Sequence, residues 1–251
     1  TLTFSGPGKF QVTAYFNDDY LVERVESRLP NPVLGDMTVA TQYAVYRDYN
    51  GVKFPSRILQ SQGGYPVLDL TVKSVEANAP VDLPVPDAVR NAVERVAVEK
   101  VADGVWFLAG GSHNSVAIEM KDHVVLVESP LYDGRSAPVV DQVKKLVPNK
   151  PIRYVVNSHT HFDHSGGLRT LAAAGATIVT HTLNKPYFEK VMANPNKLAP
   201  DRLATSGKKA KVMGVKDRMV LTDGSRSIEV HAIPGNVHTE TFLMAYLPKE
   251  K

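Results

Sequence analysis

Residues Ser158–Gly167 read SHTHFDHSGG and indicate both the fold and the chemistry of the chain. The six residues before them, IRYVVN, are apolar enough to form a buried strand. His159 and His161 are two positions apart, so in extended backbone their side chains project to the same side. Asp163 falls in the following turn, and His164 opens the next helix. Imidazole nitrogens and carboxylate oxygens are the usual ligands of a catalytic zinc ion, so the sequence predicts a metal site here.

A further candidate ligand lies some 75 residues downstream, in the segment IPGNVHTE. Pro234-Gly235 predicts a turn, and His238 stands just before the final strand. The competing interpretation of His238 is a lone histidine in a turn. For HTHFDH the competing interpretation is a polar turn with solvated histidines, which the strand–turn–helix setting disfavours.

Strands and helices alternate around the histidine-rich turn, which predicts a layered α/β arrangement. A helix is expected to begin with Ser136 as its cap and Pro138 in its first turn, and residues 182–216 are expected to be irregular. The expected strands are 115–120, 123–128, 152–157, 177–180, 227–233 and 241–247, with a hairpin over 101–108 and a helix over 168–174.

The first 90 residues have the pattern of an antiparallel β meander. Asn50-Gly51 and Gly63-Gly64 are turn signals between segments rich in aromatic and β-branched residues. Residues 78–87 contain three prolines and no periodicity, which is typical of a linker, and a short helix is expected over 88–96. The predicted organisation is an N-terminal β domain (1–80), a linker with a short helix (81–97) and a catalytic domain (98–251).

The combination of HTHFDH after a buried strand, a later Gly-turn-His-Thr and the strand HVVLVESP resembles the metallo-β-lactamase-fold hydrolase superfamily over about residues 98–251. The resemblance implies an α+β chain whose C-terminal part is a partial αββα sandwich. It implies that His159, His161 and His238 form a three-histidine zinc site. It also implies that Asp163 and His164 are the first two ligands of a second zinc site.

The chain departs from this family after its last candidate ligand. The family has a bridging carboxylate and a final histidine, but here no histidine follows His238 and no aspartate follows Asp223. The chain is therefore expected to be a fragment with one or two zinc ions, the second site being incomplete. Truncation is also expected to expose an edge of the last strand, through which copies can self-associate.

Composition narrows the function classes. The 251 residues carry a net charge of +3, which gives no argument for nucleic-acid binding, and no apolar run approaches the roughly 20 residues of a membrane span. Cysteine is absent, which excludes a thiol nucleophile and cysteine-ligated metal. The chain starts at Thr1, so any signal peptide lies outside it. The N-terminal meander resembles the sheet of periplasmic lipoprotein carriers, which favours an exported protein over a cytoplasmic one.

The leading hypothesis is a zinc-dependent hydrolase that uses a metal-bound hydroxide on a small-molecule ester, lactam, thioester or related substrate, with Asp163 orienting the hydroxide or accepting its proton. The alternative is a non-enzymatic protein that binds a ligand or partner and keeps a structural or vestigial metal site. Among the other histidines, His113 and His123 are interpreted as ordinary turn residues, and His181 is given a structural role.

Overall fold

The computed structural model describes residues 1–6 and 10–250, which fall into two compact units. The first unit comprises Thr1–Asn31 and Asp36–Ala92, and the second comprises Pro32–Gly35 and Val93–Lys251. Residues 7–9 and 251, which belong to the predicted domains, lie outside the described residues.

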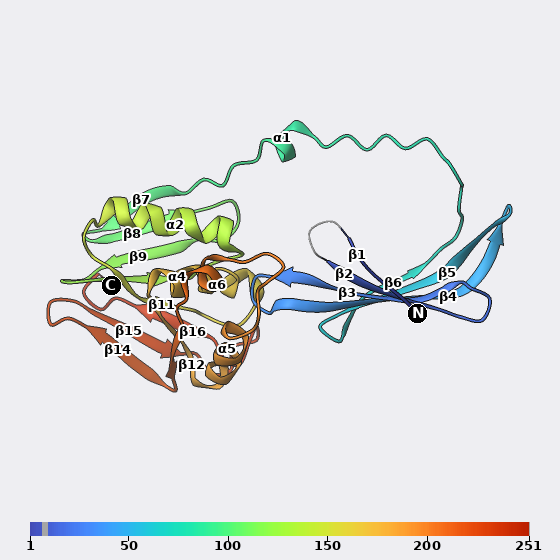
Figure 1. The fold of residues 1–251 in the computed structure, drawn as a ribbon. Coiled ribbons are helices and arrows are strands. Elements are labelled where there is room, and N and C mark those ends of the chain that lie inside the picture. Colours follow the sequence, from blue (N-terminus) through green and yellow to red (C-terminus); the bar gives the residue numbers. More distant parts are fainter. Residues whose placement is uncertain (7–9, 251) are drawn as a thin grey trace. The chain divides into compact units, whose positions relative to one another are not determined.

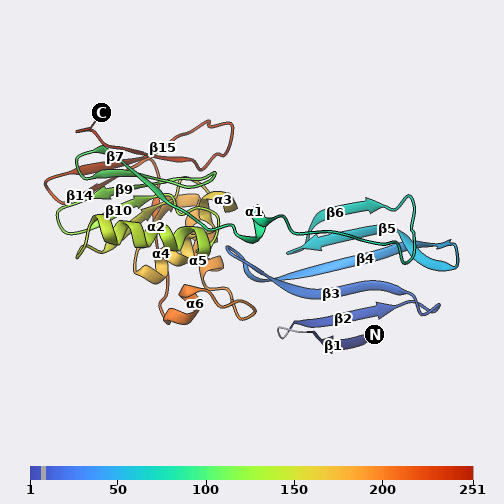
Figure 2. The same cartoon turned by 90° about the horizontal axis from the view of Figure 1, so that it is seen from above.

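The first unit is one six-stranded sheet (Figure 1), and Figure 2 shows that its strands follow chain order. Asn50 and Gly51 have φ angles of 55° and 86°, the left-handed pair that a two-residue hairpin turn requires. Gly63 and Gly64 form the next hairpin in the same way, at 58° and 89°. The predicted antiparallel meander is thereby confirmed. Its strands are β1 Leu2–Ser5, β2 Gln11–Phe16, β3 Val22–Asn31, β4 Gly35–Tyr49, β5 Val52–Gln62 and β6 Tyr65–Thr71.

The main sheet of the second unit has seven strands in the order β13-β12-β11-β10-β9-β8-β7. The strands from β10 to β13 pair in parallel, and those from β7 to β10 pair antiparallel. The apolar segment around Leu126 is the central strand, as its composition predicts. The strands are β7 Ala97–Ala102, β8 Val105–Ala109, β9 Ser115–Glu119, β10 Val124–Val127, β11 Ile152–Val156, β12 Thr177–His181 and β13 Lys211–Val215.

Both faces of this sheet are buried, because successive residues of its central strands enter two different cores. Leu126 and Val155 pack in the core under the helices, whereas Val125 and Val156 pack against a second sheet. Figure 2 shows helices on one side of β9 and β10 and strands β14 and β15 on the other. The second sheet contains β14 Arg218–Thr222, β15 Ser227–Ala232 and β16 Leu243–Tyr246. The helices are α1 Asp87–Arg90, α2 Asp133–Leu146, α3 Phe162–Ser165, α4 Leu168–Ala174, α5 Lys185–Met192 and α6 Arg202–Ser206, with a 3₁₀ turn at Thr182–Asn184.

Helix α2 begins four residues earlier than its sequence predicts, because its cap is Tyr132 rather than Ser136. Ser136 is not the cap: its hydroxyl donates to the carbonyl of Pro130 at 2.9 Å from inside the helix. Pro138 also lies in the interior, where it has no N–H to donate to the carbonyl one turn back. The helix starts at Asp133, whose negative charge suits the positive end of the helix dipole.

The expectation that residues 182–216 are irregular is wrong. They contain α5, α6 and strand β13, which pairs in parallel with β12 at the edge of the seven-stranded sheet. Only Val215 of this strand is fully buried, and Lys211 is exposed. The alternation of apolar and polar residues that marks a strand in the sequence is therefore weak. His164 does not open the helix over 168–174 either, because it lies in the separate one-turn helix α3.

The predicted α+β class is confirmed: an antiparallel sheet makes up the first unit, and helices, a mixed sheet and a further sheet are layered in the second. Strand β16 pairs with β15 and, among the described residues, with no other strand, so self-association through its free edge stays a prediction. No helix in the described part of the chain is both long and apolar enough to cross a membrane.

Candidate metal centre

Two of the candidate ligands follow the end of strand β11. The strand is held into the sheet up to Asn157, whose N–H donates to Val179 of β12 at 2.9 Å. The next N–H, that of Ser158, donates to the Glu128 carboxylate at 2.7 Å. His159 is therefore buried to 1% exposure at the bottom of the site, while His161 at the start of α3 is exposed.

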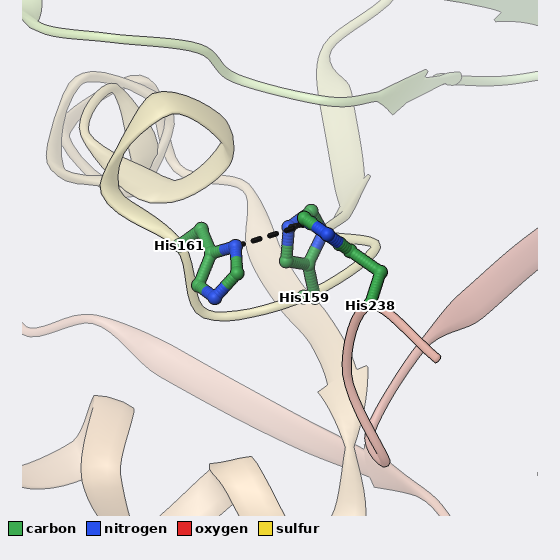
Figure 3. A group of neighbouring side chains, drawn as sticks. All are labelled: His159, His161 and His238. Atoms are coloured by element: carbon green, nitrogen blue, oxygen red, sulfur yellow. Dashed lines mark hydrogen bonds between the residues drawn. The ribbon is translucent and has the colours of Figure 1, made fainter. Parts of the chain in front are cut away.

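The third candidate ligand comes from the loop between β15 and β16. His238 Nε2 lies 3.1 Å from His159 Nε2 and 3.1 Å from His161 Nδ1. Figure 3 shows the three rings facing one another. Folding thus brings His238 next to His159, 79 positions away in the chain, and next to His161, 77 positions away.

The spacing of these nitrogens fits a metal ion. Tetrahedral zinc ligands with bond lengths of about 2.0–2.1 Å stand about 3.3 Å from one another, close to the 3.1 Å separations found here. A neutral imidazole offers one lone pair, and three such nitrogens within 4.8 Å of one another could hold a cation. Two of the three histidines are exposed, so the site is open on the solvent side. An open coordination position is the mark of catalytic rather than structural zinc sites.

The surroundings of His159 favour its neutral form, which is the form that binds metal. Burial, followed by the charges of the neighbouring His164, His161 and His238 rings, lowers the pKa of His159 from 6.5 to about 4. The hydroxyl of Ser158 lies 2.9 Å from His159 Nδ1. This contact fixes the ring so that Nε2 is directed toward the other two histidines.

A second group of donor atoms lies next to the first. The rings of His159 and His164 have centroids 4.3 Å apart. His164 Nδ1 donates to the Glu128 carboxylate, and this hydrogen bond raises the pKa of His164. A carboxylate accepts but does not donate, so Nδ1 carries the proton, and His164 Nε2 faces Asp163 Oδ2 at 3.8 Å. Burial raises the pKa of Asp163, but hydrogen bonds from its own N–H and from His113 outweigh it, and the net shift is downward.

Two residues of this group were missed by the sequence interpretation. His113, interpreted as an ordinary turn residue, places Nε2 3.0 Å from Asp163 Oδ2. Glu128 adopts φ of 68° at the end of β10 and contacts both Ser158 and His164. No local motif marks His113, whereas Glu128 is signalled by its place at the end of the most apolar strand, HVVLVE.

His181 and His123 contact neighbouring residues and belong to neither group of donor atoms. His181 lies 9% exposed at the end of β12, where its ring accepts a hydrogen bond from the N–H of Leu183. His123 is buried and bonded to Asp122 at 2.6 Å. The donor atoms of the five predicted ligands His159, His161, Asp163, His164 and His238 lie in two adjacent groups that could each hold a metal ion.

Comparison with known proteins gives a consistent result. A curated metallo-beta-lactamase type 2 from Bacillus cereus is 22% identical over 187 residues, which are 71% of this chain and 65% of that protein. This chain therefore spans about two thirds of its relative's length. Similar solved structures include a metallo-beta-lactamase from Pontibacter korlensis (TM-score 0.47, 19% identity, 62% of this chain and 68% of that one). Another is a flavoprotein from Thermotoga maritima (TM-score 0.49, 17% identity, 63% of this chain and 41% of that one).

The family assignment rests on the sequence model of the metallo-beta-lactamase superfamily, which matches residues 108–251. The match covers more than half of the chain and includes both candidate donor groups. The resemblance expected from the sequence is confirmed, and the chain belongs to the metallo-beta-lactamase superfamily.

Proposed function

We propose that this protein is a zinc-dependent hydrolase of a small-molecule ester, lactam, thioester or related compound. The observation that carries the proposal is the convergence of His159, His161 and His238, with nitrogen separations of 3.1 Å at a solvent-open site. Superfamily membership supports hydrolase chemistry at the level of the family.

The chain's own residues divide the work of hydrolysis between them. Zinc, when bound, would lower the pKa of a coordinated water to about 7 and polarise a carbonyl group. His159, His161 and His238 would hold the ion as neutral imidazoles. Asp163 has its pKa lowered, so it is ionised near neutral pH and suited to orient the attacking water or accept its proton. No serine or cysteine nucleophile is required.

Two exposed apolar residues are sequence neighbours of candidate ligands. Phe162 follows the ligand His161 and is 59% exposed, and Val237 precedes the ligand His238 and is fully exposed. These side chains are suited to contact an apolar part of the substrate, because covering them removes apolar surface from water.

The test combines metal analysis with hydrolysis assays on ester, lactam and thioester substrates. Purified protein should contain zinc by elemental analysis, and His161→Ala should lose both zinc and turnover. His231→Ala is the matched control, because His231 pairs with Glu229 on β15 away from both donor groups. Turnover that survives complete removal of metal would overturn the proposal.

A second candidate function is non-enzymatic binding by the first unit. All seven residues of β6 are exposed, and three of them, Val67, Leu68 and Leu70, are aliphatic. Val67 and Leu68 also line a hollow of about 550 Å³. Binding of an apolar ligand that is unchanged in His161→Ala, together with no turnover on any substrate, would favour this role.

A further inference from the structure

His113 stands out among the histidines because its surroundings in the fold match those of the candidate ligands. It lies in the loop between β8 and β9, 50 positions before Asp163, yet its Nε2 reaches Asp163 Oδ2 at 3.0 Å. The donor atoms of His113, Asp163 and His164 all lie within 4.8 Å of one another. The rings of His113 and His164 meet edge to face with centroids 5.3 Å apart.

We propose that His113 is a metal-binding residue, which together with Asp163 and His164 forms a three-donor centre for a second divalent cation. The inference rests on the proposed function, since it places this ion beside the one held by His159, His161 and His238. Two imidazoles and one carboxylate suit zinc and related divalent metals.

The distances between the three donor atoms are compatible with a metal centre. His164 Nε2 lies 3.8 Å from Asp163 Oδ2, too far for a hydrogen bond but close to the spacing of about 3.3 Å between ligands of one tetrahedral ion. The distance from His113 Nε2 to Asp163 Oδ2 is 3.0 Å, slightly shorter than that spacing. Both separations are compatible with one cation bound by all three atoms.

The ring of His113 is oriented by the same device as that of His159. In each case the serine that precedes the histidine contacts Nδ1, Ser112 at 2.8 Å and Ser158 at 2.9 Å. A serine hydroxyl can accept a hydrogen bond from Nδ1–H, and with the proton on Nδ1 the Nε2 lone pair of His113 can bind a metal in place of the hydrogen bond that Nε2–H donates to Asp163. Metal-bound histidines are commonly held in this way at their second nitrogen.

A buried arginine holds the loop that carries His113 by a hydrogen bond to its backbone. Arg135, 1% exposed, donates from Nη2 to the carbonyl of His113 at 3.0 Å. Gly110 packs so tightly on this guanidinium that a Cβ there would stand 2.1 Å from Nη2. The Asn114 side chain accepts from the Gly110 N–H at 3.1 Å and closes the loop. His113 is therefore placed in advance, as a ligand of a preformed site is.

The experiment is a zinc titration of metal-free protein by calorimetry, with cobalt absorption spectra as a second readout. The unmodified protein should bind two ions per chain, and His113→Ala should bind one, with the affinity of the remaining ion unchanged within about threefold. His113→Gln tests the competing role, because glutamine keeps a hydrogen bond to Asp163 but is a poor zinc ligand. If His113 is a metal ligand, His113→Gln should bind one ion, as His113→Ala does. His231→Ala is the histidine control and should bind two.

Two results would overturn the inference. If His113→Gln binds two ions as tightly as the unmodified protein, His113 only positions Asp163. If the unmodified protein binds a single ion that His113→Ala does not weaken, there is no second centre at His113. The proposed function survives both results and fails only if His161→Ala leaves metal-dependent turnover intact or turnover needs no metal.

Discussion

Replacing Gly166 by alanine should damage both the stability of the second unit and its candidate metal centre. Gly166 follows α3 with φ −63° and ψ −23°, a conformation that alanine adopts freely, so the conflict is purely steric. A Cβ at this position would stand 1.6 Å from the carbonyl oxygen of Leu131 and 2.9 Å from that of Phe162. Both neighbours are backbone atoms, which cannot rotate away as a side chain can.

The magnitude follows from the displacement required. Real Cβ contacts are essentially never below 3.0 Å, so Gly166 and Leu131 must separate by about 1.4 Å. Overpacking costs about 1–3 kcal/mol, and a clash of backbone with backbone lies at the upper end. A loss of about 3 kcal/mol corresponds to a fall in Tm of about 6–12 °C for a chain of this size. The Leu131 N–H donates to the Asp163 carbonyl at 3.1 Å, so movement of Leu131 also shifts Asp163 and should weaken metal binding.

Thermal unfolding of metal-free protein, followed by circular dichroism, measures this effect. Gly111→Ala is the matched control, because a Cβ there meets nothing within 4 Å. It should change the free energy of unfolding by less than about 0.5 kcal/mol. The reasoning is refuted if Gly166→Ala and Gly111→Ala have the same Tm and bind zinc with the same affinity.

Two further substitutions test the contacts around the site and under the helices. Glu128→Gln removes the negative charge that accepts the hydrogen bond from His164, and it should lower the affinity for zinc about 10–100-fold. The affinity is measured by competition with a chelating chromophore. Glu229→Gln is the control and should leave the affinity unchanged. Asp201→Asn should cost about 3 kcal/mol in urea unfolding at pH 7, because it leaves the charge of Arg169, 4% exposed, without its carboxylate partner. Burial raises the pKa of Asp201, but the hydrogen bonds from Arg169 outweigh it and the net shift is downward. The pair therefore stabilises the fold above the ordinary carboxyl pKa and loses this effect as pH falls through the folded-state pKa, a dependence that the variant should lack.

Local signals in the sequence predicted the parts of the fold whose pattern is set by neighbouring residues. The apolar segment before His159 is β11, and the helix over Leu168–Ala174 has the predicted bounds. The turn at Asn50-Gly51 adopts the left-handed pair that its composition indicates. The convergence of His238 with His159 and His161 was expected from the family resemblance rather than from any local pattern.

The parts that were missed depend on contacts formed only in the folded chain. Strand β13 is an edge strand with one buried residue, Val215, so its sequence lacks the apolar character of a central parallel strand. Helix α2 extends past Ser136 toward its N-terminus because Asp133 accepts a hydrogen bond from Thr170, 37 positions away, at 2.6 Å. His113 meets Asp163 across 50 positions, and neither residue signals the other in the sequence.

The most direct test of the account is a crystal structure of the protein grown with zinc, with anomalous diffraction recorded at the zinc edge. The account predicts an anomalous peak at about 2.0–2.1 Å from one nitrogen of each of His159, His161 and His238. Density that shows these three rings in contact with no anomalous peak between them, or the His238 ring turned away from the other two, would contradict it.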